Sequence, residues 1–592
     1  RAVTWPFNFY TIIWTLSMRS KLFPALVIVI GALILVLPQV LAHKMLLGSD
    51  SIFHYNRFYE AAMQLKEGNF HYFITMYGFQ QSGRIINALY GPVAAYFNGA
   101  LLLVGKTWFN YQILSDIAVY LLAGGSMYAL LRKCKLRVSY SLGLALFYLT
   151  TYAIQYWTLS QAFSGWAAAL LPLCLLPLVT FIIEKQVNVL ELALCTALMF
   201  QIHFLTSLFV VMAYLPAFIY AFVKTPERIK MLQHMALAVG LFFLLTANIW
   251  AGLVEVYFGN TVLQPFINKN MYGTAVSLNA YRLSNWLSPF GIVILGGLQI
   301  ILLLLFWKKI STLNKIVSLE AMFFLILSSR LLPWKWLSQT FEFVNVLQFP
   351  FRFFVPYTVL LLMSIGLFAT ELKLDGRMMI GALILLVTCS FVQTIQALEQ
   401  DLAVWDEPEE FMYQKNTIYF TDDIQKIKQA FFSTDLALGL RYVQKSTPDY
   451  LPLYTKLTAQ DEIHGYRHYR KQVLMQEQKF TKAATTDALV YQWDAAEAKE
   501  IIVPAIGYKN TKVVLNGKVL TDAQLGHTRI GALKLRQKRG HNRLELSYVP
   551  AKATVVFLVL PAFVWLGCLG IVIKRKGYNK KDDAKINCLS AR

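Results

Sequence analysis

The stretch LFPALVIVIGALILVLPQVLA, residues 22–42, is followed closely by Gly48-Ser49-Asp50. A bilayer core about 30 Å thick requires about 20 apolar residues in a helix, and this stretch supplies them without a charged residue. Asp50 comes just after it, at the membrane surface, where an acid is costly unless it is paired or used. This stretch therefore predicts a membrane helix with a candidate functional group at its outer end.

The composition of the whole chain agrees with a membrane protein. The 592 residues are 57% hydrophobic and only 15% charged, whereas a soluble chain has roughly a quarter of its residues charged. A soluble enzyme is excluded. The net charge of +22 falls in short clusters between apolar runs, which indicates membrane topology and not a nucleic-acid partner.

The apolar runs predict a polytopic α-helical membrane protein with about twelve transmembrane helices. We expect spans at residues 22–42, 111–131, 138–153, 166–183, 188–203, 205–223, 231–250, 288–306, 316–329, 353–371, 378–396 and 553–573. A further apolar stretch, residues 92–105, is short and is interpreted as a membrane-dipping helix on the outer face. Every second loop is then basic, which predicts that both termini are cytoplasmic.

Three outward segments are too long to be simple connections: residues 44–110, 251–287 and 397–552. The last changes composition sharply and ends in alternating runs at 489–493, 500–506, 511–515, 528–537 and 542–549, with Asn516-Gly517 as a hairpin turn. We therefore expect a transmembrane domain (1–396) with a long first outer loop (44–110). An extracytoplasmic α+β domain (397–552) should follow, with a β-sandwich or jelly roll in its second half, and then a last helix with a basic cytoplasmic tail (553–592).

The first outer loop begins with Asp50 and continues into a predicted amphipathic helix. Phe58, Ala61, Ala62 and Leu65 recur at helical spacing, and Glu60, Gln64 and Glu67 fall on other faces. We expect this helix to lie along the interface and to guide a lipid-borne headgroup to Asp50. Asp50 could equally be the N-cap of this helix, and His54, one turn later, could simply bond the loop.

Cations interleaved with aromatic residues mark a later outer loop. Arg352 begins an apolar helix just after Pro350, and Arg330 follows a short span. Such arginines suit a lipid-linked phosphate, which they bind in a bidentate manner, although an aromatic belt with cations reaching the headgroups gives a similar pattern. We favour phosphate binding for Arg352, with Arg330 next.

Weaker candidates lie elsewhere in the chain. His203 separates two short spans and is interpreted mainly as a packing histidine, although intramembrane polar groups commonly face a cavity. Four further residues are candidates on the outer side, each supported by a single feature of the sequence: Arg84, Glu255, Arg282 and Glu342. The sequence has no phosphate-binding glycine loop, no P-loop and no metalloprotease motif, so ATP use is not indicated.

These features together resemble the GT-C superfamily of polyprenyl-phosphate-sugar-dependent glycosyltransferases, and most closely its YfhO-type bacterial membrane proteins. The resemblance is carried by Gly48-Ser49-Asp50, Tyr90-Gly91-Pro92, residues 348–353 (QFPFRF) and the terminal β block with Val503-Pro504 and Asn516-Gly517. Many such enzymes have an acidic pair in the first loop. Here the nearest acids to Asp50 are Glu60 and Glu67, so the need for a divalent metal stays open and no metal ligands are assigned.

The resemblance implies transfer of a sugar from undecaprenyl phosphate to an envelope glycopolymer such as a teichoic acid, outside a bacterial plasma membrane and with inversion. Asp50 would be the base, and Arg352 with Arg330 would hold the phosphate. His54, His203, Arg84, Glu255 and Arg282 are supporting candidates. A separate synthase would supply the donor. Tyrosines such as Tyr466, Tyr469 and Tyr508 would bind the acceptor or pack in the core of the sandwich, and Tyr548, inside an alternating strand, is interpreted as a core residue. Two alternatives stay open: a lipid-linked-sugar transporter or flippase, and a non-catalytic polymer-binding scaffold.

Overall fold

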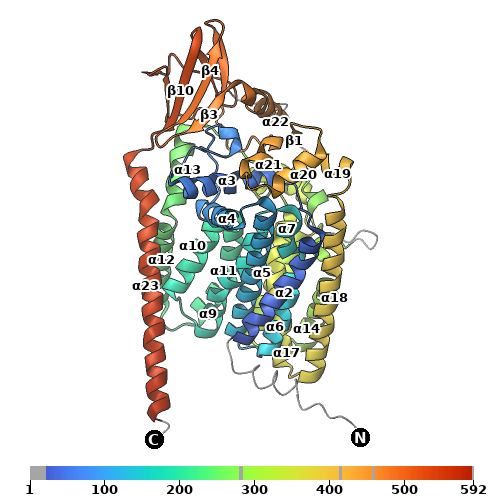
Figure 1. Ribbon diagram of the computed structural model, residues 1–592. Helices are drawn as coiled ribbons and strands as arrows, with labels where there is room; N and C mark the ends of the chain where they lie inside the picture. The colour runs from blue at the N-terminus through green and yellow to red at the C-terminus, as the bar shows by residue number, and fades with distance from the viewer. Residues whose placement is uncertain (1–21, 279–284, 413–415, 456–460, 590–592) are drawn as a thin grey trace.

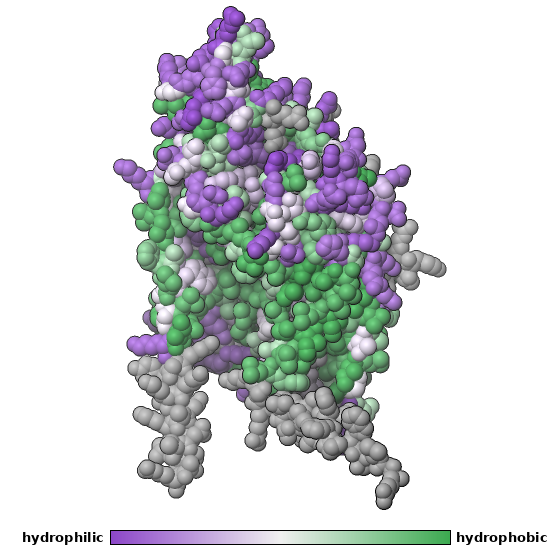
Figure 2. Space-filling model, in the orientation of Figure 1, coloured by the Kyte–Doolittle hydropathy of each residue, from purple (hydrophilic) through white to green (hydrophobic). Residues whose placement is uncertain are grey.

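The computed structural model describes residues 22–278, 285–412, 416–455 and 461–589. Figure 1 shows a bundle of long helices with a β-rich domain at one end. Hydrophobic residues dominate the visible surface of the bundle, and hydrophilic residues gather over the β-rich domain (Figure 2). The chain is therefore a helical membrane protein with a polar domain at one end of its bundle.

The helices of the bundle follow one another in chain order. They are α2 (Leu22–Ala42), α5 (Trp108–Lys133), α6 (Val138–Leu149), α7 (Tyr152–Ser160), α8 (Ser164–Cys174), α9 (Leu176–Glu184), α10 (Val189–Ile202), α11 (Phe204–Lys224), α12 (Arg228–Leu245), α13 (Ala247–Gly259), α14 (Gly291–Phe306), α15 (Thr312–Ser328), α17 (Phe354–Glu371), α18 (Gly376–Ala403) and α23 (Lys552–Leu589). Among the described residues, 8 helical segments are long and apolar enough to cross a membrane.

Each of the twelve expected spans coincides with one or two of these helices, but length alone supports only eight of them. The spans expected at 138–153, 188–203, 288–306 and 316–329 correspond to helices of 12, 14, 16 and 17 residues. The stretch at 92–105 is a 14-residue apolar helix, α4 (Pro92–Gly105). The fold class is thus confirmed as helical and membrane-type, and the count of twelve stays a prediction.

Several spans are broken where polar side chains or prolines interrupt the backbone hydrogen bonds. The break between α12 and α13 lies at Thr246, whose hydroxyl donates to the carbonyl of Phe242. Pro172 and Pro177 flank the break at Leu175 between α8 and α9. Backbone groups inside a bilayer need partners within the protein, and side-chain hydroxyls such as that of Thr246 bond them at such breaks.

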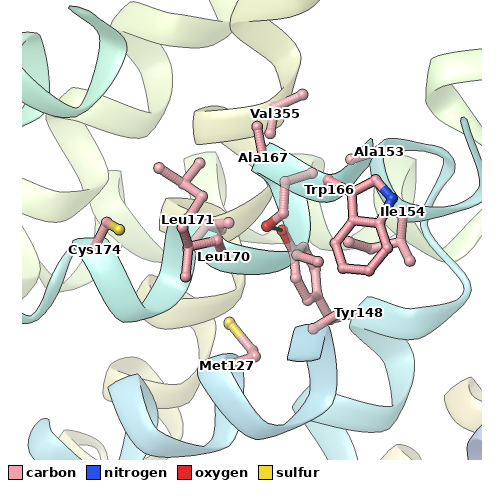
Figure 3. Packing of buried hydrophobic residues seen from close by; sticks show 14 of the residues in the cluster. Met127, Tyr148, Ala153, Ile154, Trp166, Ala167, Leu170, Leu171, Cys174 and Val355 are labelled. Carbon is pink, nitrogen blue, oxygen red and sulfur yellow. Dashed lines mark hydrogen bonds between the residues drawn. The ribbon is translucent and has the colours of Figure 1, made fainter. Parts of the chain in front are cut away.

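The centre of the bundle is α17, which is buried from Phe354 to Ala369. A helix that is apolar on all sides belongs in the interior. Its Gly366 lies so close to Leu136 that a Cβ would approach that side chain to 2.2 Å, as is typical of small residues at membrane helix contacts. Figure 3 shows the packing of α6 against α8, where Tyr148 of α6 lies beside Trp166 and Leu170 of α8 and donates to the Ala168 carbonyl.

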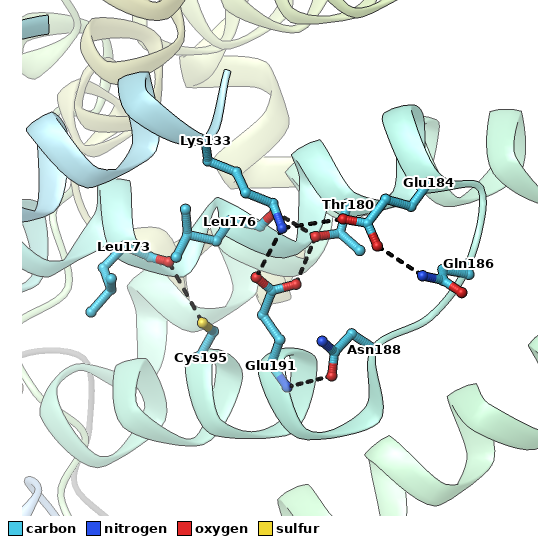
Figure 4. Close-up of polar contacts among 9 residues, drawn as sticks. All are labelled: Lys133, Leu173, Leu176, Thr180, Glu184, Gln186, Asn188, Glu191 and Cys195. Atoms are coloured by element: carbon cyan, nitrogen blue, oxygen red, sulfur yellow. Dashed lines mark hydrogen bonds and ion pairs between the residues drawn. The ribbon is translucent and has the colours of Figure 1, made fainter. Parts of the chain in front are cut away.

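An ion-pair cluster ties three helices together at the end of α5 that is remote from the β-rich domain (Figure 4). Lys133 lies 3.3 Å from the carboxylate of Glu184 and 3.7 Å from that of Glu191. Thr180 also donates to Glu191, at 2.7 Å. These groups are partly exposed, so we expect a small contribution to stability.

The β-rich domain, residues 404–551, lies between α18 and α23. Its helices are α19 (Pro408–Met412), α20 (Ile424–Phe432), α21 (Leu436–Tyr442), α22 (Asp461–Gln472) and η6 (Leu474–Lys479). Its strands are β1 (Thr417–Tyr419), β2 (Val443–Lys445), β3 (Thr481–Ala484), β4 (Leu489–Ala495), β5 (Glu500–Ile506), β6 (Thr511–Leu515), β7 (Lys518–Val519), β8 (Gly526–His527), β9 (Ala532–Arg536) and β10 (Gly540–Tyr548). The boundary expected at residue 397 falls inside α18.

The strands form antiparallel sheets with the orders β3-β4-β10-β6-β7, β5-β9-β8 and β1-β2. The first two share one hydrophobic cluster, to which Leu489 and Leu544 contribute from one sheet and Val503 and Leu533 from the other. The predicted hairpin is present, because Asn516 and Gly517 both have positive φ between β6 and β7. The terminal β block is therefore confirmed, including its turn.

A layer of short elements joins the β-rich domain to the bundle. It contains α3 (Ser51–Glu67), η1 (Phe79–Gln81), α4, η2 (Tyr272–Thr274), η3 (Asn285–Leu287), α16 (Trp334–Thr340), η4 (Glu342–Leu347) and η5 (Pro350–Phe353). The expectation that α3 lies on the interface with Glu60 and Gln64 facing outward is wrong: both are buried, 1% and 3% exposed. The helix is covered by the rest of the 44–110 segment and by α4, so it is a core helix.

Glu60 shows why the helix tolerates an acid on a buried face. Its carboxylate accepts backbone N–H groups from Met76, Tyr77 and Gly78 at 2.9, 2.7 and 2.7 Å, and an amide N–H from Gln64 at 2.7 Å. Burial raises the pKa of Glu60, and the three backbone hydrogen bonds lower it in part. This one side chain fixes the loop that follows α3.

Glu60→Ala is expected to lower the free energy of unfolding by about 3–5 kcal/mol. The change leaves three buried N–H groups without an acceptor, and each costs about 1–3 kcal/mol. Thermal unfolding of the detergent-solubilised protein measures the loss. Glu67→Ala, at the exposed end of the same helix, is the matched control and should change stability by less than about 0.5 kcal/mol. Equal unfolding temperatures for the two variants would contradict this role.

Candidate functional site

Asp50 lies at the junction of the bundle and the β-rich domain. Its loop is pressed against the end of α7: a Cβ on Gly48 would lie 2.3 Å from the Cα of Ser160, and the Asp50 N–H faces the Ser160 carbonyl at 3.4 Å. Asp50 occupies the N-cap position of α3, yet its side chain makes no capping hydrogen bond. The carboxylate is instead bonded by the side chain of Ser49. The N-cap alternative therefore does not account for this carboxylate.

Asp50 lies at the protein surface, where the charges of Lys445 and Arg352 act on it, and we call the space around it the recess. The residue itself is exposed, but protein atoms crowd its carboxyl group, and this desolvation raises its pKa. The positive charges of Lys445 and then Arg352 lower the pKa in part. The side chain is therefore accessible from the surface, while neighbouring protein groups set the electrostatics of its carboxyl group.

Arg352 lies 302 positions later in the sequence, and its charge acts on Asp50. It lies on η5, and its guanidinium donates to the Leu347 carbonyl at 3.0 Å and stacks 5.1 Å from the centre of the Phe349 ring. Its charge acts on Asp50, Tyr90 and Tyr156. Among the described residues it forms no ion pair within 4.0 Å.

The β-rich domain supplies the remaining wall of the recess. Lys445 on β2 interacts with Asp50, which partly offsets the desolvation that lowers the lysine pKa. Asp449 has its pKa raised to about 6, chiefly by burial, with Arg84 lowering it and Asp50 raising it further. Tyr466 on α22 interacts with both carboxylates. Sequence analysis missed Lys445, Asp449, Tyr90 and Tyr156 as site residues, because no local motif connects segments so far apart in the chain.

We refer to this group as the Asp50 recess. It consists of Asp50, Tyr90, Tyr156, Arg352, Lys445, Asp449, Tyr450 and Tyr466. Its two cations and two carboxylates come from three separate segments, and tyrosines accompany them. Such a set can hold an anionic group beside a proton acceptor.

His54 is buried and forms a pair with Arg57. The guanidinium donates to His54 Nδ1 at 3.1 Å, and also to the carbonyls of Tyr90 at 2.9 Å and Gly91 at 3.3 Å. Because an arginine only donates, Nδ1 is the acceptor and the histidine is neutral with its proton on Nε2. Burial is the main cause that lowers the pKa of His54 well below its usual value, and it lowers that of Arg57 to about 10. The pair fixes the turn at Tyr90 and Gly91.

His203 lies at the break between α10 and α11. Its Nδ1 accepts the backbone N–H of Thr206 at 3.3 Å, so the ring caps α11 and carries its proton on Nε2. The ring also interacts with the charges of Arg352 and Arg57. Gly91 fits against this break, since a Cβ there would lie 2.6 Å from the carbonyl of Gln201. His203 is thus a capping residue that borders the recess.

The other candidates have structural contacts. Arg84 is buried and donates to the carbonyls of Thr447 at 2.7 Å and Asp449, so it anchors the loop that carries Asp449. Glu255 accepts from Asn510 at 2.6 Å and from Ala551 and Thr554, and joins α13 to the start of α23.

Arg330 is exposed and contacts Tyr272 and the Gly273 carbonyl; no contact among the described residues brings it to Asp50. Glu342 is exposed at the start of η4. Arg282 lies outside the described residues. Of the proposed acceptor-binding tyrosines, Tyr469 and Tyr508 are buried in the core of the β-rich domain, whereas Tyr466 lies in the recess.

Metal ligands and known relatives do not define the site further. Within the described part of the chain, no three His, Cys, Asp or Glu residues are grouped as metal ligands would be. No family model, no curated protein and no solved structure matches the chain. The fold and site thus define the class, a helical membrane protein with a charged recess at the junction of its two parts.

Proposed function

We propose that this chain is a membrane glycosyltransferase that moves a sugar from a polyprenyl-phosphate carrier to an extracytoplasmic glycopolymer. The observation that supports this most is the electrostatic interaction of the exposed Asp50 with Arg352, which lies 302 positions later in the sequence. The resemblance to YfhO-type GT-C proteins suggests the same two residues. In this proposal the β-rich domain is extracytoplasmic and both termini are cytoplasmic.

The reaction uses a proton acceptor and a cationic phosphate site. Asp50 takes the proton of the acceptor hydroxyl while the hydroxyl oxygen bonds to the anomeric carbon. The bond from that carbon to the phosphate oxygen breaks, and its electron pair leaves with the polyprenyl phosphate. Arg352 and Lys445 hold the developing negative charge. Attack opposite the leaving group inverts the anomeric configuration.

An apolar surface beside Arg352 suits the isoprenoid tail of the donor. Leu331, Trp336, Phe343 and Val346 are all exposed in the short elements that lead to η5. Exposed apolar side chains at the end of a helix bundle contact lipid, with aromatic rings at the headgroup level. A tail lying along this surface would bring its phosphate to the guanidinium of Arg352.

The direct test is a reaction with purified protein in liposomes. A polyprenyl-phosphate sugar and an acceptor polymer should yield free polyprenyl phosphate and glycosylated polymer in equal amounts. Movement of the intact donor across the bilayer without bond formation would favour the flippase instead. Binding of polymer without either reaction would favour the scaffold.

Lys445→Gln is expected to reduce transfer at neutral pH about tenfold, because a hydrogen bond to a charged group contributes about 1.5–3 kcal/mol. It should also shift the pH–rate profile. The Lys445 charge lowers the pKa of Asp50, so its removal raises that pKa. The base works only when ionised, and activity will therefore begin to fall at a higher pH as the solution is acidified. Lys499→Gln, an exposed lysine paired with Glu497, should leave the profile unchanged.

A further inference from the structure

A second charged feature lies on the β-rich domain, apart from the Asp50 recess. It is an open groove of about 630 Å³. Its lining consists of Arg467, His468, Lys471 and Gln472 from α22, Gln476 from η6, Ile502 from β5, and Arg529. Among the described residues that line it, none is acidic. We call it the α22 groove.

The cations of the groove follow the spacing of a helix face. Arg467 and Lys471 are four residues apart on α22 and both are exposed. Side chains at this spacing are neighbours, with Cβ atoms about 5–6 Å apart. Together with Arg529 they create a positive field over a concave surface, which concentrates anions. A ligand with several regularly spaced negative charges fits this row better than a single anion.

The groove and the recess share one helix. Tyr466, which interacts with Asp50 and Asp449, directly precedes Arg467 in α22. Successive residues of a helix point about 100° apart, so the face that borders the recess adjoins the face that lines the groove. Helix α22 therefore contributes residues both to the groove and to the Asp50 recess.

We propose that the α22 groove binds the backbone of an anionic phosphodiester polymer and directs its chain past Tyr466 into the Asp50 recess. The guanidinium of Arg467 pairs with phosphate oxygens, and Lys471 adds a point charge to the next phosphate. This deepens the proposed function, on which it rests for the role of the polymer as acceptor. The binding itself requires no chemistry at Asp50.

The test is equilibrium binding of a labelled glycerol-phosphate oligomer to the full chain in nanodiscs of zwitterionic lipid, measured by fluorescence anisotropy over a range of salt. The double variant Arg467→Gln/Lys471→Gln should bind at least about tenfold more weakly. The dependence of log affinity on log salt should also fall by about 1.5, because two phosphate contacts are lost. The charge-preserving variant Arg467→Lys/Lys471→Arg should retain most of the affinity.

Two controls separate this inference from general charge and from the proposed reaction. Lys512→Gln/Lys518→Gln removes the same charge from β6 and β7, away from the groove lining, and should bind normally. Asp50→Asn should also bind normally. If Asp50→Asn binds the oligomer normally while the native protein transfers no sugar, polymer binding by the α22 groove is supported and the proposed sugar transfer is excluded.

Three results would contradict polymer binding by the α22 groove. The first is equal oligomer affinity of the native protein and the Arg467→Gln/Lys471→Gln variant. The second is displacement of the oligomer by orthophosphate at an equal phosphate concentration, which would indicate a single-anion site. The third is a requirement for anionic lipid in the nanodisc, which would indicate a membrane-binding surface.

Discussion

Asp50→Asn is expected to reduce sugar transfer about 1,000-fold while the protein stays folded. A positioned general base contributes about 10²–10⁴-fold to a rate, and an amide of the same shape cannot take the proton of the acceptor hydroxyl. The Asp50 side chain does not cap α3, so the substitution removes no helix hydrogen bond. Initial rates of product formation in proteoliposomes measure the effect, with donor concentration varied to separate kcat from KM.

Glu67→Gln is the matched control for this experiment. It makes the same change of a carboxylate to an amide at the other, exposed end of α3, and should retain full activity. Asp50→Asn should change kcat and leave the KM for the donor within about threefold, since the base acts in the transition state. Native rates in Asp50→Asn, with the thermal stability of both variants unchanged, would exclude Asp50 as the base and favour the scaffold alternative.

The pairing of Asp50 with Arg352 could be predicted because each residue has a strong local setting. Asp50 follows an uninterrupted apolar helix, and Arg352 precedes another with a proline before it. Helices that cross a membrane must begin and end at its two surfaces, so the positive-inside pattern places both residues on one side. The sequence therefore predicts that both residues lie near the same membrane surface, but it does not predict the lateral distance between them.

The contribution of the β-rich domain could not be predicted in the same way. Lys445 belongs to a three-residue strand and Asp449 to a loop, and neither is within any periodic pattern. Their positions depend on long-range contacts, such as the hydrogen bonds from Arg84 to the backbone of Thr447 and Asp449. Such contacts join residues more than 360 positions apart, which no single-sequence pattern reports.

The interpretation of α3 failed for a related reason. The spacing predicts an interfacial helix with Glu60 and Gln64 away from its apolar face, because polar residues on an amphipathic helix lie opposite the apolar stripe. Here the following loop folds back and presents backbone N–H groups to the Glu60 carboxylate. A buried acid with several hydrogen bonds is compatible with a core, but its donors come from residues that have no side-chain signature.

Arg352→Ala is expected to reduce transfer about 100- to 1,000-fold, close to the effect at Asp50. Removing one preorganised charge donor from a reacting oxyanion typically costs about 3–4 kcal/mol of transition-state stabilisation. Arg352→Lys should recover only part of the activity, because a lysine keeps the charge but lacks the planar fork that binds two phosphate oxygens. The same proteoliposome assay measures both, and inhibition by added polyprenyl phosphate reports the loss of phosphate binding.

Arg330→Ala tests whether the loss of sugar transfer is specific to Arg352. The alternative is that removing any cation from the aromatic-rich segment 330–352 has the same effect. Arg330 is exposed and contacts Tyr272 instead of the recess, so its removal should lower transfer by less than about threefold. A larger loss in Arg330→Ala than in Arg352→Ala would place the donor phosphate at the Tyr272 surface and away from Asp50. Weakened inhibition by polyprenyl phosphate in Arg352→Ala, with Arg330→Ala like the native protein, would instead place the leaving group beside the carboxylate that activates the acceptor.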